Sequence, residues 1–260
     1  MKNNLDLGFS PCPNDTHIFY DFVKKNHFRI HIHDVEDLNQ KAFKCKYDVS
    51  KISFYAWYKI KKNYQLLNYG AALGRGCGPL LITKSQKVFN QSFVVAIPGE
   101  FTTAHLLFRL CYKNAKSIIF MPFDKIMDAL ENGYVDAAVI IHEGRFTFES
   151  RGFRCEQDLG DWWENETQLP IPLGCIVAKK ILGEKKIFEI EEKLSDSIQY
   201  ALKNPTMTYE YVKKYAQEMD DEVICKHIKT YVNNYTLDLS SEGHRAIIDL
   251  ESKAKKAGLI

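Results

Sequence analysis

The sequence is short of three features that would each point to a particular class of protein: long apolar runs, closely paired cysteines and an excess of one charge. No stretch approaches the roughly 18 apolar residues of a membrane-spanning helix. Residues 1–6 contain no apolar run of the length found in signal peptides. We therefore expect a cytoplasmic protein that does not enter a membrane.

The seven cysteines are odd in number and widely separated, and no Cys-x-x-Cys pair is present. This spacing argues against a zinc site and against a dithiol redox motif, so the cysteines are expected to be reduced thiols. Cys12 lies in a conspicuous loop, but neither a base nor a second cysteine is near it in sequence. A nucleophilic role is therefore not favoured, and its role stays open.

The net charge is only +2, and the lysines form short clusters such as 59–62 and 253–256. These clusters are typical of solvated helix faces, and no basic stripe with interleaved aromatics predicts nucleic-acid binding. With 260 residues, of which 45% are hydrophobic, the chain is a globular protein of the size at which one core divides into two.

The first third of the chain alternates strand and helix patterns, with strands expected at 5–9, 28–35 and 48–53 and helices at 16–25 and 38–46. Parallel strands require crossover connections, so this order predicts a mostly parallel sheet covered by helices. A glycine-rich turn at residues 74–78 lacks the Gly-Lys-Ser/Thr ending of a phosphate loop, and a structural role is expected for it.

A second alternating unit begins at residue 93, and the patterns indicate strands at 93–97, 117–121 and 136–141 with helices at 102–111 and 123–132. Residues 152–172 show no clear periodicity and are expected to be irregular; a strand at 174–178 and a helical C-terminal region follow.

The two units resemble each other, since each has a helix, then a Tyr-Asp or Tyr-Val-Asp step, then an apolar strand. The predicted architecture is therefore a bilobal α/β binding-protein fold. Its larger lobe comprises residues 1–88 and 176–260 and its smaller lobe residues 89–175, with crossings near 84–92 and 172–180. In open α/β sheets ligands lie beyond the carboxyl ends of the strands, so Ser53 and His142 are expected to face each other across a cleft.

The loop at residues 8–16 is the most informative local motif. Two prolines exclude a regular ladder and hold the chain extended. The side chains of Ser10, Asn14, Asp15 and Thr16 can contact a ligand, or they can simply cap a helix that begins near residue 17.

His142 follows an apolar strand, which is a natural position for a general base, although a hydrogen-bonded structural histidine is the alternative. Residues 98–105 join another strand to a helix, with Thr102 and Thr103 in the first turn. Free backbone N–H groups at such a turn bind anions, so a substrate carboxylate is the expected guest, and Thr102 is expected also to cap the helix.

With these residues identified, the sequence resembles the 1,4-dihydroxy-6-naphthoate synthase family of the futalosine route to menaquinone. The resemblance spans the chain and is carried by five motifs in order: Ser10-Pro-Cys-Pro-Asn-Asp-Thr16, Tyr47-Asp-Val-Ser-Lys-Ile-Ser53, Pro98-Gly-Glu-Phe-Thr-Thr-Ala104, Ile140-Ile-His-Glu-Gly-Arg-Phe-Thr147 and Pro172-Leu-Gly-Cys175. The chain departs from the family at Gly144, where a larger residue, often serine, is expected; this bears only on the flexibility of the loop.

The resemblance implies a two-lobed, periplasmic-binding-protein-like (type II) fold and a carbon–carbon lyase. The implied reaction converts cyclic dehypoxanthinyl futalosine to 1,4-dihydroxy-6-naphthoate, with loss of the sugar-derived fragment as the three-carbon ketone dihydroxyacetone. No metal or organic cofactor is implied. His142 takes the role of proton acceptor, and the substrate-binding residues are Lys51, Ile52, Ser53, Thr102, Thr103 and Ala104, with Asn14, Asp15 and Asn39 as further candidates.

Two alternatives stay open. A chorismate dehydratase of the same pathway predicts the same lobes and a carboxylate-bearing substrate, but it resembles this chain poorly at 10–16 and 141–143. A non-catalytic binding protein of the same fold would need an export signal or a lipid anchor, which residues 1–6 do not show. Whether the protein is a monomer or a homodimer, and which group protonates the leaving fragment, do not follow from the residues.

Overall fold

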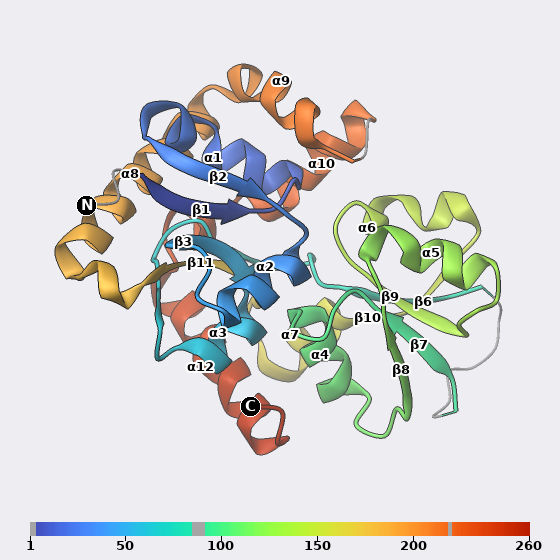
Figure 1. Ribbon diagram of the computed structural model, residues 1–260. Helices are drawn as coiled ribbons and strands as arrows, with labels where there is room; N and C mark the ends of the chain where they lie inside the picture. Colours follow the sequence, from blue (N-terminus) through green and yellow to red (C-terminus); the bar gives the residue numbers. More distant parts are fainter. Residues whose placement is uncertain (1–3, 85–91, 218–219) are drawn as a thin grey trace.

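The computed structural model describes residues 4–84, 92–217 and 220–260, and its strands form two separate sheets (Figure 1). The first sheet has the order β2-β1-β3-β11-β4, and β5 also pairs with β11. The bounds of these strands are β1 Leu5–Phe9, β2 Phe28–Ile32, β3 Val49–Ser53, β4 Tyr64–Leu66, β5 Ala72–Gly74 and β11 Ile171–Lys179.

The second sheet has the order β10-β6-β9-β7-β8. Its strands are β6 Leu80–Thr83, β7 Val94–Ile97, β8 Ser117–Phe120, β9 Ala137–Ile140 and β10 Arg154–Asp158. The two sheets are the two lobes that the internal similarity of the sequence predicts.

Both sheets combine three parallel strands with antiparallel neighbours. β1 is parallel to β2 and β3, and β7 is parallel to β8 and β9. β11 is antiparallel to β3, β4 and β5, while β6 is antiparallel to β9 and β10. The prediction of a mostly parallel sheet therefore holds for the βαβ units and is wrong for the strands next to the crossings. β6 and β11 enter their sheets from the other lobe, so no helical crossover sets their direction.

Helices cover the outer faces of both sheets. On the first sheet α1 packs against α8 and α9, and in the second lobe α5 packs against β7 and β9 (Figure 1). The helix bounds are α1 Pro13–Lys25, α2 Val35–Phe43, α3 Phe54–Ile60, α4 Thr103–Cys111, α5 Phe123–Glu131, α6 Gly144–Thr147, α7 Leu159–Thr167, α8 Glu184–Lys203, α9 Pro205–Tyr215, α10 Asp221–Tyr231, α11 Asn234–Leu237 and α12 Ser240–Lys256, with short 3-10 turns at Glu149–Arg151 and Lys180–Leu182.

The largest apolar cluster runs through both lobes. It joins Tyr58 and Leu38 of the first lobe to Leu107 of α4 and the fully buried Trp163 of α7. Two smaller clusters lie under α1 and α8 in the first lobe and under α5 in the second. Continuous apolar packing across the junction fixes the carboxyl ends of both sheets around one space.

The sheets place the crossings earlier in the chain than the sequence predicts. β6 belongs to the second sheet, although the predicted boundary at 88 assigns its residues to the first lobe. The whole of β11 belongs to the first sheet, including its residues before 176. The chain thus changes sheets between Gly74 and Leu80 and again before Ile171, and most of the predicted crossing at 84–92 lies outside the described residues.

Residues 152–172 are not irregular as predicted. They form strand β10 and helix α7, and the Asp158 side chain caps the helix by accepting hydrogen bonds from the backbone N–H groups of Gly160 and Asp161. The strand is short and mostly polar, because its edge position leaves it open to solvent, so it shows no apolar alternation.

Candidate active site

A cavity lies between the two lobes, at the carboxyl ends of β1 and β3 on one side and of β9 on the other. Residues from all five motifs that carry the family resemblance meet there. The predicted residues that line it are Asn14, Asp15, Lys51, Ile52, Ser53, Thr102, Thr103, Ala104 and His142. Ser10 also lines it, whereas Thr16 and Asn39, which is fully buried behind Ser53, do not.

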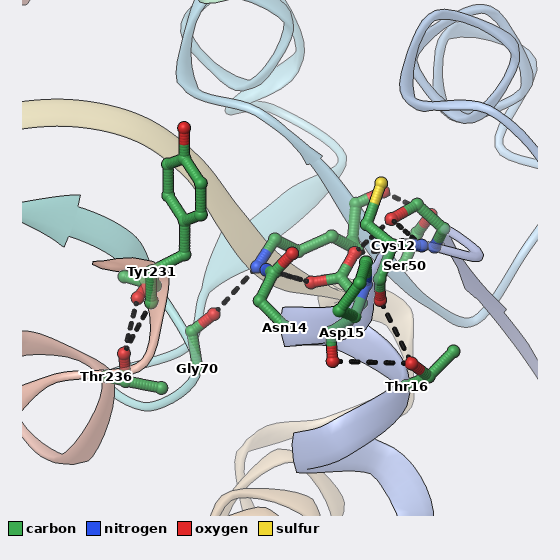
Figure 2. Close-up of polar contacts among 12 residues, drawn as sticks. Cys12, Asn14, Asp15, Thr16, Ser50, Gly70, Tyr231 and Thr236 are labelled. Atoms are coloured by element: carbon green, nitrogen blue, oxygen red, sulfur yellow. Dashed lines mark hydrogen bonds and ion pairs between the residues drawn. The ribbon is translucent and has the colours of Figure 1, made fainter. Parts of the chain in front are cut away.

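Helix α1 begins earlier than predicted, at Pro13, with Cys12 as its N-terminal cap residue. Proline suits the first helical position because its fixed φ is helical and its missing N–H has no partner there anyway. Asn14 and Asp15 consequently lie in the first turn of the helix, not in an extended loop. Both are buried and line the cavity. Figure 2 shows their side chains next to each other.

Asp15 is the centre of a buried polar network. Its Oδ1 lies 2.9 Å from the ammonium of Lys51 and accepts a hydrogen bond from Asn14 Nδ2 at 2.9 Å. Its Oδ2 accepts a hydrogen bond from the Ser10 hydroxyl at 2.7 Å. Lys51 Nζ also donates to the carbonyl of Gly70 at 3.0 Å. Dashed lines in Figure 2 mark the contacts of this ammonium with Asp15 and Gly70. Because both charges are satisfied, the network is a fixed wall of the cavity.

Asn39 positions Ser53. Its Oδ1 accepts from the Ser53 backbone N–H at 2.9 Å, and its Nδ2 donates to the Ser53 hydroxyl at 3.1 Å. The same Nδ2 lies 3.2 Å from Glu36 Oε2, which also accepts from the backbone N–H of Phe101 in the other lobe. Asn39 therefore acts through Ser53, and Glu36 links this arrangement to the start of the Thr102 turn.

The two threonines of the second lobe have different partners. Thr102 caps α4, accepting from the backbone N–H of His105 at 3.2 Å and donating to the carbonyl of Gly99 at 2.9 Å. The Thr103 hydroxyl donates to the carbonyl of Leu173 in β11 at 2.6 Å. Thr102 thus forms the helix start, while Thr103 joins the two lobes beside the cavity.

His142 lies two residues after β9, with φ of 56°, in the left-handed region that few non-glycine residues adopt. Its ring packs against the ring of Phe123 at 4.9 Å. Burial lowers the pKa of His142 to about 4; the charge of Lys51 also lowers it, and that of Asp15 opposes the shift. The imidazole is therefore neutral at physiological pH, as a general base must be.

The Cys12 sulfur lies against the ring of His142, 3.2 Å from Nδ1 and 3.9 Å from Nε2. Burial raises the pKa of the Cys12 thiol well above its usual value, and the negative charges of Glu143 and Asp15 raise it further. Cys12 is therefore a neutral thiol, in line with the prediction that it is not a nucleophile.

His227 of α10 stands on the opposite wall, its ring parallel to that of His142 with centroids 6.2 Å apart. Asn14 donates its Nδ2 to Asp15, so its Oδ1 must accept from His227 Nε2, at 2.8 Å. The buried Nδ1 of His227 has no hydrogen-bond partner among the described residues, and Glu143 Oε1 lies 3.5 Å away. Burial holds the pKa of His227 well below its usual value, and a proton on the nearby His142 ring would lower it further.

The sequence did not indicate His227 or Tyr231, which both line the cavity. They lie four residues apart on α10, and their rings contact each other with centroids 4.6 Å apart. This spacing is typical of a helix packing face. A histidine on such a face was the one feature of the sequence that could have indicated a site residue here. The other lining residues that were not predicted are Val35, Ala72, Cys77, Gly78, Pro79, Ile141, Leu173 and Gly174.

The glycine-rich turn at 74–78 contributes to the cavity through its last residues. A side chain at Gly78 would lie 2.3 Å from the backbone nitrogen of Gly160, so only glycine allows the two segments to approach this closely. Arg145 donates to the Gly78 carbonyl at 2.5 Å and pairs with Asp158 at 2.5 Å. These contacts hold the loop after His142. At Gly144 a side chain would meet its nearest neighbour at 3.5 Å, so the loop has room for a larger residue.

Within residues 4–84, 92–217 and 220–260, no group of three or more His, Cys, Asp or Glu side chains is arranged to hold a metal ion. None of the helices described there is long and apolar enough to cross a membrane.

Comparison with known proteins gives a consistent result. A family model described as menaquinone biosynthesis matches residues 5–256. A curated 1,4-dihydroxy-6-naphthoate synthase of Thermus thermophilus is 41% identical over 98% of this chain and 95% of its own length. The enzyme of the same name from Streptomyces coelicolor is 37% identical over 99% of this chain and 95% of its own length.

Solved structures share the fold. A crystal structure of a protein from Archaeoglobus fulgidus has a TM-score of 0.95 at 32% identity and covers 100% of this chain and 99% of its own. The periplasmic aliphatic sulphonate binding protein of Escherichia coli has a TM-score of 0.66 at 9% identity, covering 100% of this chain and 89% of its own. The latter likeness confirms the predicted periplasmic-binding-protein-like fold and says nothing about the ligand.

Proposed function

This chain belongs to the menaquinone biosynthesis family, and from that premise we propose that it converts cyclic dehypoxanthinyl futalosine to 1,4-dihydroxy-6-naphthoate and dihydroxyacetone. The proposal makes the protein a carbon–carbon lyase with a small carboxylate-bearing substrate. We also propose that the protein is cytoplasmic and that the reaction needs no added metal or cofactor. The observation that supports it most is a neutral histidine at the end of β9, facing a fixed polar wall.

In the proposed reaction, His142 removes a proton from the substrate to start ring opening and carbon–carbon cleavage. An imidazole whose pKa is about 4 is unprotonated throughout the physiological range, so it is ready to accept a proton without prior deprotonation. Its low basicity also makes the resulting imidazolium a good proton donor later in the cycle. The left-handed backbone at His142 fits a site where the surrounding structure holds a residue in an uncommon conformation.

The substrate carboxylate is assigned to the wall formed by Ser53, Thr103 and Ala104. The first turn of α4 leaves backbone N–H groups without partners inside the helix, and the positive end of its dipole favours an anion. The Ser53 hydroxyl adds a donor, and Asn39 fixes its orientation. Lys51 is a poorer carboxylate ligand than its charge suggests, because Asp15 already neutralises it.

Enclosure of the reacting atoms is the remaining part of the proposal. Both lobes line the cavity. At the edge of the cavity the lobes are in direct contact, through the hydrogen bond from the Thr103 hydroxyl to the Leu173 carbonyl. Excluding water strengthens the polar contacts to the developing oxyanion and protects a reactive intermediate from solvent. Opening and closing of the lobes would admit substrate and release the two products.

The first test is to incubate the purified protein with cyclic dehypoxanthinyl futalosine, without added metal or cofactor, and to follow naphthoate by chromatography. The His142→Ala variant and a chorismate incubation serve as parallel reactions. Naphthoate from the wild type alone, with chorismate left intact, is the expected result. Consumption of chorismate would favour the dehydratase, and no product from either substrate would favour a binding protein. Near-normal turnover by His142→Ala would remove this residue as the base.

A further inference from the structure

Glu36 of α2 makes a polar contact between the lobes next to the proposed carboxylate site. Its Oε2 accepts a hydrogen bond at 3.1 Å from the backbone N–H of Phe101, in the loop between β7 and α4 of the second lobe. The same oxygen lies 3.2 Å from Asn39 Nδ2, and Oε1 accepts from Gln40 Nε2 at 2.9 Å. Glu36 is not among the residues that line the cavity, so it acts on the site through these neighbours.

The loop before α4 fits closely against α2. A Cβ atom added to Gly99 would lie 2.5 Å from Glu36 Oε2 and 2.7 Å from Glu36 Cβ, so a side chain there would displace the carboxylate. The Phe101 ring packs against the ring of Phe43, at the end of α2, with centroids 4.5 Å apart. The loop and the helix belong to different lobes, so opening of the lobes would separate all of these groups.

The donors assigned to the substrate carboxylate also come from both lobes. The Ser53 hydroxyl belongs to the end of β3, and the backbone N–H groups of Thr103 and Ala104 belong to the first turn of α4. The next N–H of that turn, from His105, is taken by the cap residue Thr102, so the first two remain for an anion. The spacing of these donors therefore depends on how the lobes are joined.

We propose that Glu36 is a positioning residue that fastens the turn at 101–104 to Asn39 and Ser53 when the lobes close, so that the carboxylate site is complete only in the closed form. This role rests on the proposed function, which supplies the substrate carboxylate. Asn39 Nδ2 donates both to Glu36 Oε2 and to the Ser53 hydroxyl. One chain of hydrogen bonds thus runs from Phe101 in the second lobe to Ser53 in the first, and it couples lobe closure to the orientation of Ser53.

A carboxylate suits this position because its charge strengthens the contacts that it accepts. Hydrogen bonds to a charged acceptor are roughly twice as strong as those between neutral groups. Burial raises the pKa of Glu36, and its hydrogen bonds oppose that shift by stabilising the carboxylate. Water replaces the Phe101 N–H as a donor when the lobes part, so the contact is made and broken at little net cost in each cycle.

The alternative is a role confined to α2, in which Glu36 serves its own helix through Asn39 and Gln40. A substitution in the other lobe separates the two roles. Gly99→Ala leaves α2 unchanged, and Gly99 has no positive φ, so alanine fits its backbone. Its methyl group would displace the Glu36 carboxylate. Gly99→Ala should therefore reproduce the effects of Glu36→Ala, and the two losses should not add in the double variant.

The first experiment measures the separation of the lobes without turnover. Cys155 on β10 and Cys225 on α10 are exposed and belong to different lobes, so each can carry a spin label. The half-buried Cys45 and Cys111 are replaced by alanine in the background used for labelling. Double electron–electron resonance then gives the distribution of interlobe distances in the ligand-free protein, and the closed form is the one with the label separation of this structure.

We expect the ratio of the closed form to the open form to fall about tenfold in Glu36→Ala and in Gly99→Ala, because a hydrogen bond to a charged group is lost. Glu36→Gln should recover part of the loss, because its amide oxygen still accepts from the Phe101 N–H. The same distance distribution in Glu36→Ala as in the wild type would overturn the proposal, and so would a Gly99→Ala variant that stays closed.

The second experiment compares kcat and KM. A substrate that binds only the closed form has an apparent affinity reduced by the closed fraction, and saturation with substrate restores closure. In Glu36→Ala, KM should therefore rise by the factor by which the closed fraction falls, with kcat changed less than about twofold. Glu36→Gln should lie between this variant and the wild type. A merely structural role would lower kcat, through the amount of folded enzyme, and leave KM unchanged; that result would overturn the proposal.

Asp37→Ala is the matched control. Asp37 is the next residue of α2, and its exposed carboxylate lies 3.7 Å from the ammonium of Lys41 on the same helix. The variant should leave the interlobe distances, kcat and KM unchanged. Opening in Asp37→Ala as large as in Glu36→Ala would show that any loss of charge on α2 opens the lobes, and would overturn the assignment to Glu36. Absence of product from every variant would remove the proposed reaction, while the distance measurement would still decide the role of Glu36 in closure.

Discussion

The two walls of the cavity treat their polar groups in opposite ways. On the wall of the first lobe, Asp15 is hydrogen-bonded or ion-paired to Lys51, Ser10 and Asn14, so both of its oxygens have partners. On the wall of the second lobe, His142 has one weak polar partner, a sulfur atom, and a left-handed backbone. The first wall is thus held rigid by its own polar contacts, whereas the proposed base on the second wall has few polar partners among the described residues.

The electrostatics of the two walls agree with this division. Lys51 and Asp15 are charged and almost fully buried, and each compensates the cost of burying the other. His142 is kept neutral by burial, so it pays no such cost until it accepts a proton. Substitutions on the first wall should therefore act on stability, and substitutions on the second wall on turnover.

The largest effect is expected for His142→Asn. Asparagine tolerates the left-handed backbone, so the fold should be retained while the base is lost. The kcat should fall by about 10² to 10⁴, which is the usual contribution of general base catalysis. Steady-state kinetics measure kcat, and calorimetry measures the affinity for the substrate. A variant that binds substrate normally and keeps more than a tenth of the rate would show that the second wall does not carry the base.

The next effect concerns the buried ion pair. Lys51→Met should lower the free energy of unfolding by about 3–5 kcal/mol, because it leaves the Asp15 carboxylate buried without its cation. Lys51→Met combined with Asp15→Asn should recover much of this loss. Urea denaturation of the two single variants and the double variant gives the coupling energy. Additive losses in the double variant would mean that the first wall is not held by this pair.

A third comparison uses two histidines whose pKa values burial lowers to about 4, His17 in α1 and His142. Between pH 6.5 and 4 the unfolded chain binds protons at these positions and the folded protein does not, so the stability of the fold falls as the pH falls. Each histidine contributes up to about 3 kcal/mol to this loss. His17 Nδ1 lies 2.7 Å from the Thr208 hydroxyl, and His17 is not among the residues that line the cavity.

Chemical denaturation at several pH values between 4 and 7 tests this comparison. His17→Gln and His142→Asn should each make the free energy of unfolding less dependent on pH, and only His142→Asn should abolish turnover. A His17 variant with the pH dependence of the wild type would show that its ring is not held neutral in the fold. Loss of turnover in His17→Gln would extend the reactive region into the first wall.

The smallest effect is expected at the start of α4. Thr102→Ala removes the cap of the helix and should cost about 1 kcal/mol, and Thr102→Ser should restore it. Thermal unfolding measures the stability, and KM for the substrate reports the anion site at the same turn. A loss of stability with an unchanged KM would identify Thr102 as a helix cap alone. A raised KM that serine does not restore would place its methyl group in contact with substrate.

The alternation of strands and helices could be predicted from the residues, because apolar periodicity and turn residues are local signals. The predicted strand at 48–53 and the helix at 123–132 agree with β3 and α5 to within a residue or so. The crossings could not be placed, because the residues of β6 show the same apolar pattern in either sheet. Strand β10 carried no apolar alternation, so its membership in the second sheet had no local sign.

The candidate site follows the same rule. Residues at strand ends, such as Ser53 and His142, were predictable because the carboxyl ends of strands collect ligands in this class of fold. His227 and Tyr231 were not predictable, because α10 approaches the cavity only when the C-terminal helices pack against α1. The contact of Cys12 with His142 was equally hidden, since the two residues are 130 positions apart in the chain.

Local sequence patterns specify the order of strands and helices, the two repeated units and the residues that end the strands. These follow from interactions within a few residues, which the chain carries with it in any state. Tertiary packing alone specifies which thiol lies against the His142 ring, which carboxylate neutralises Lys51 and which helix lines the far side of the cavity. Those contacts join segments that are far apart in the chain, and their geometry is set when the two sheets pack around a shared apolar core.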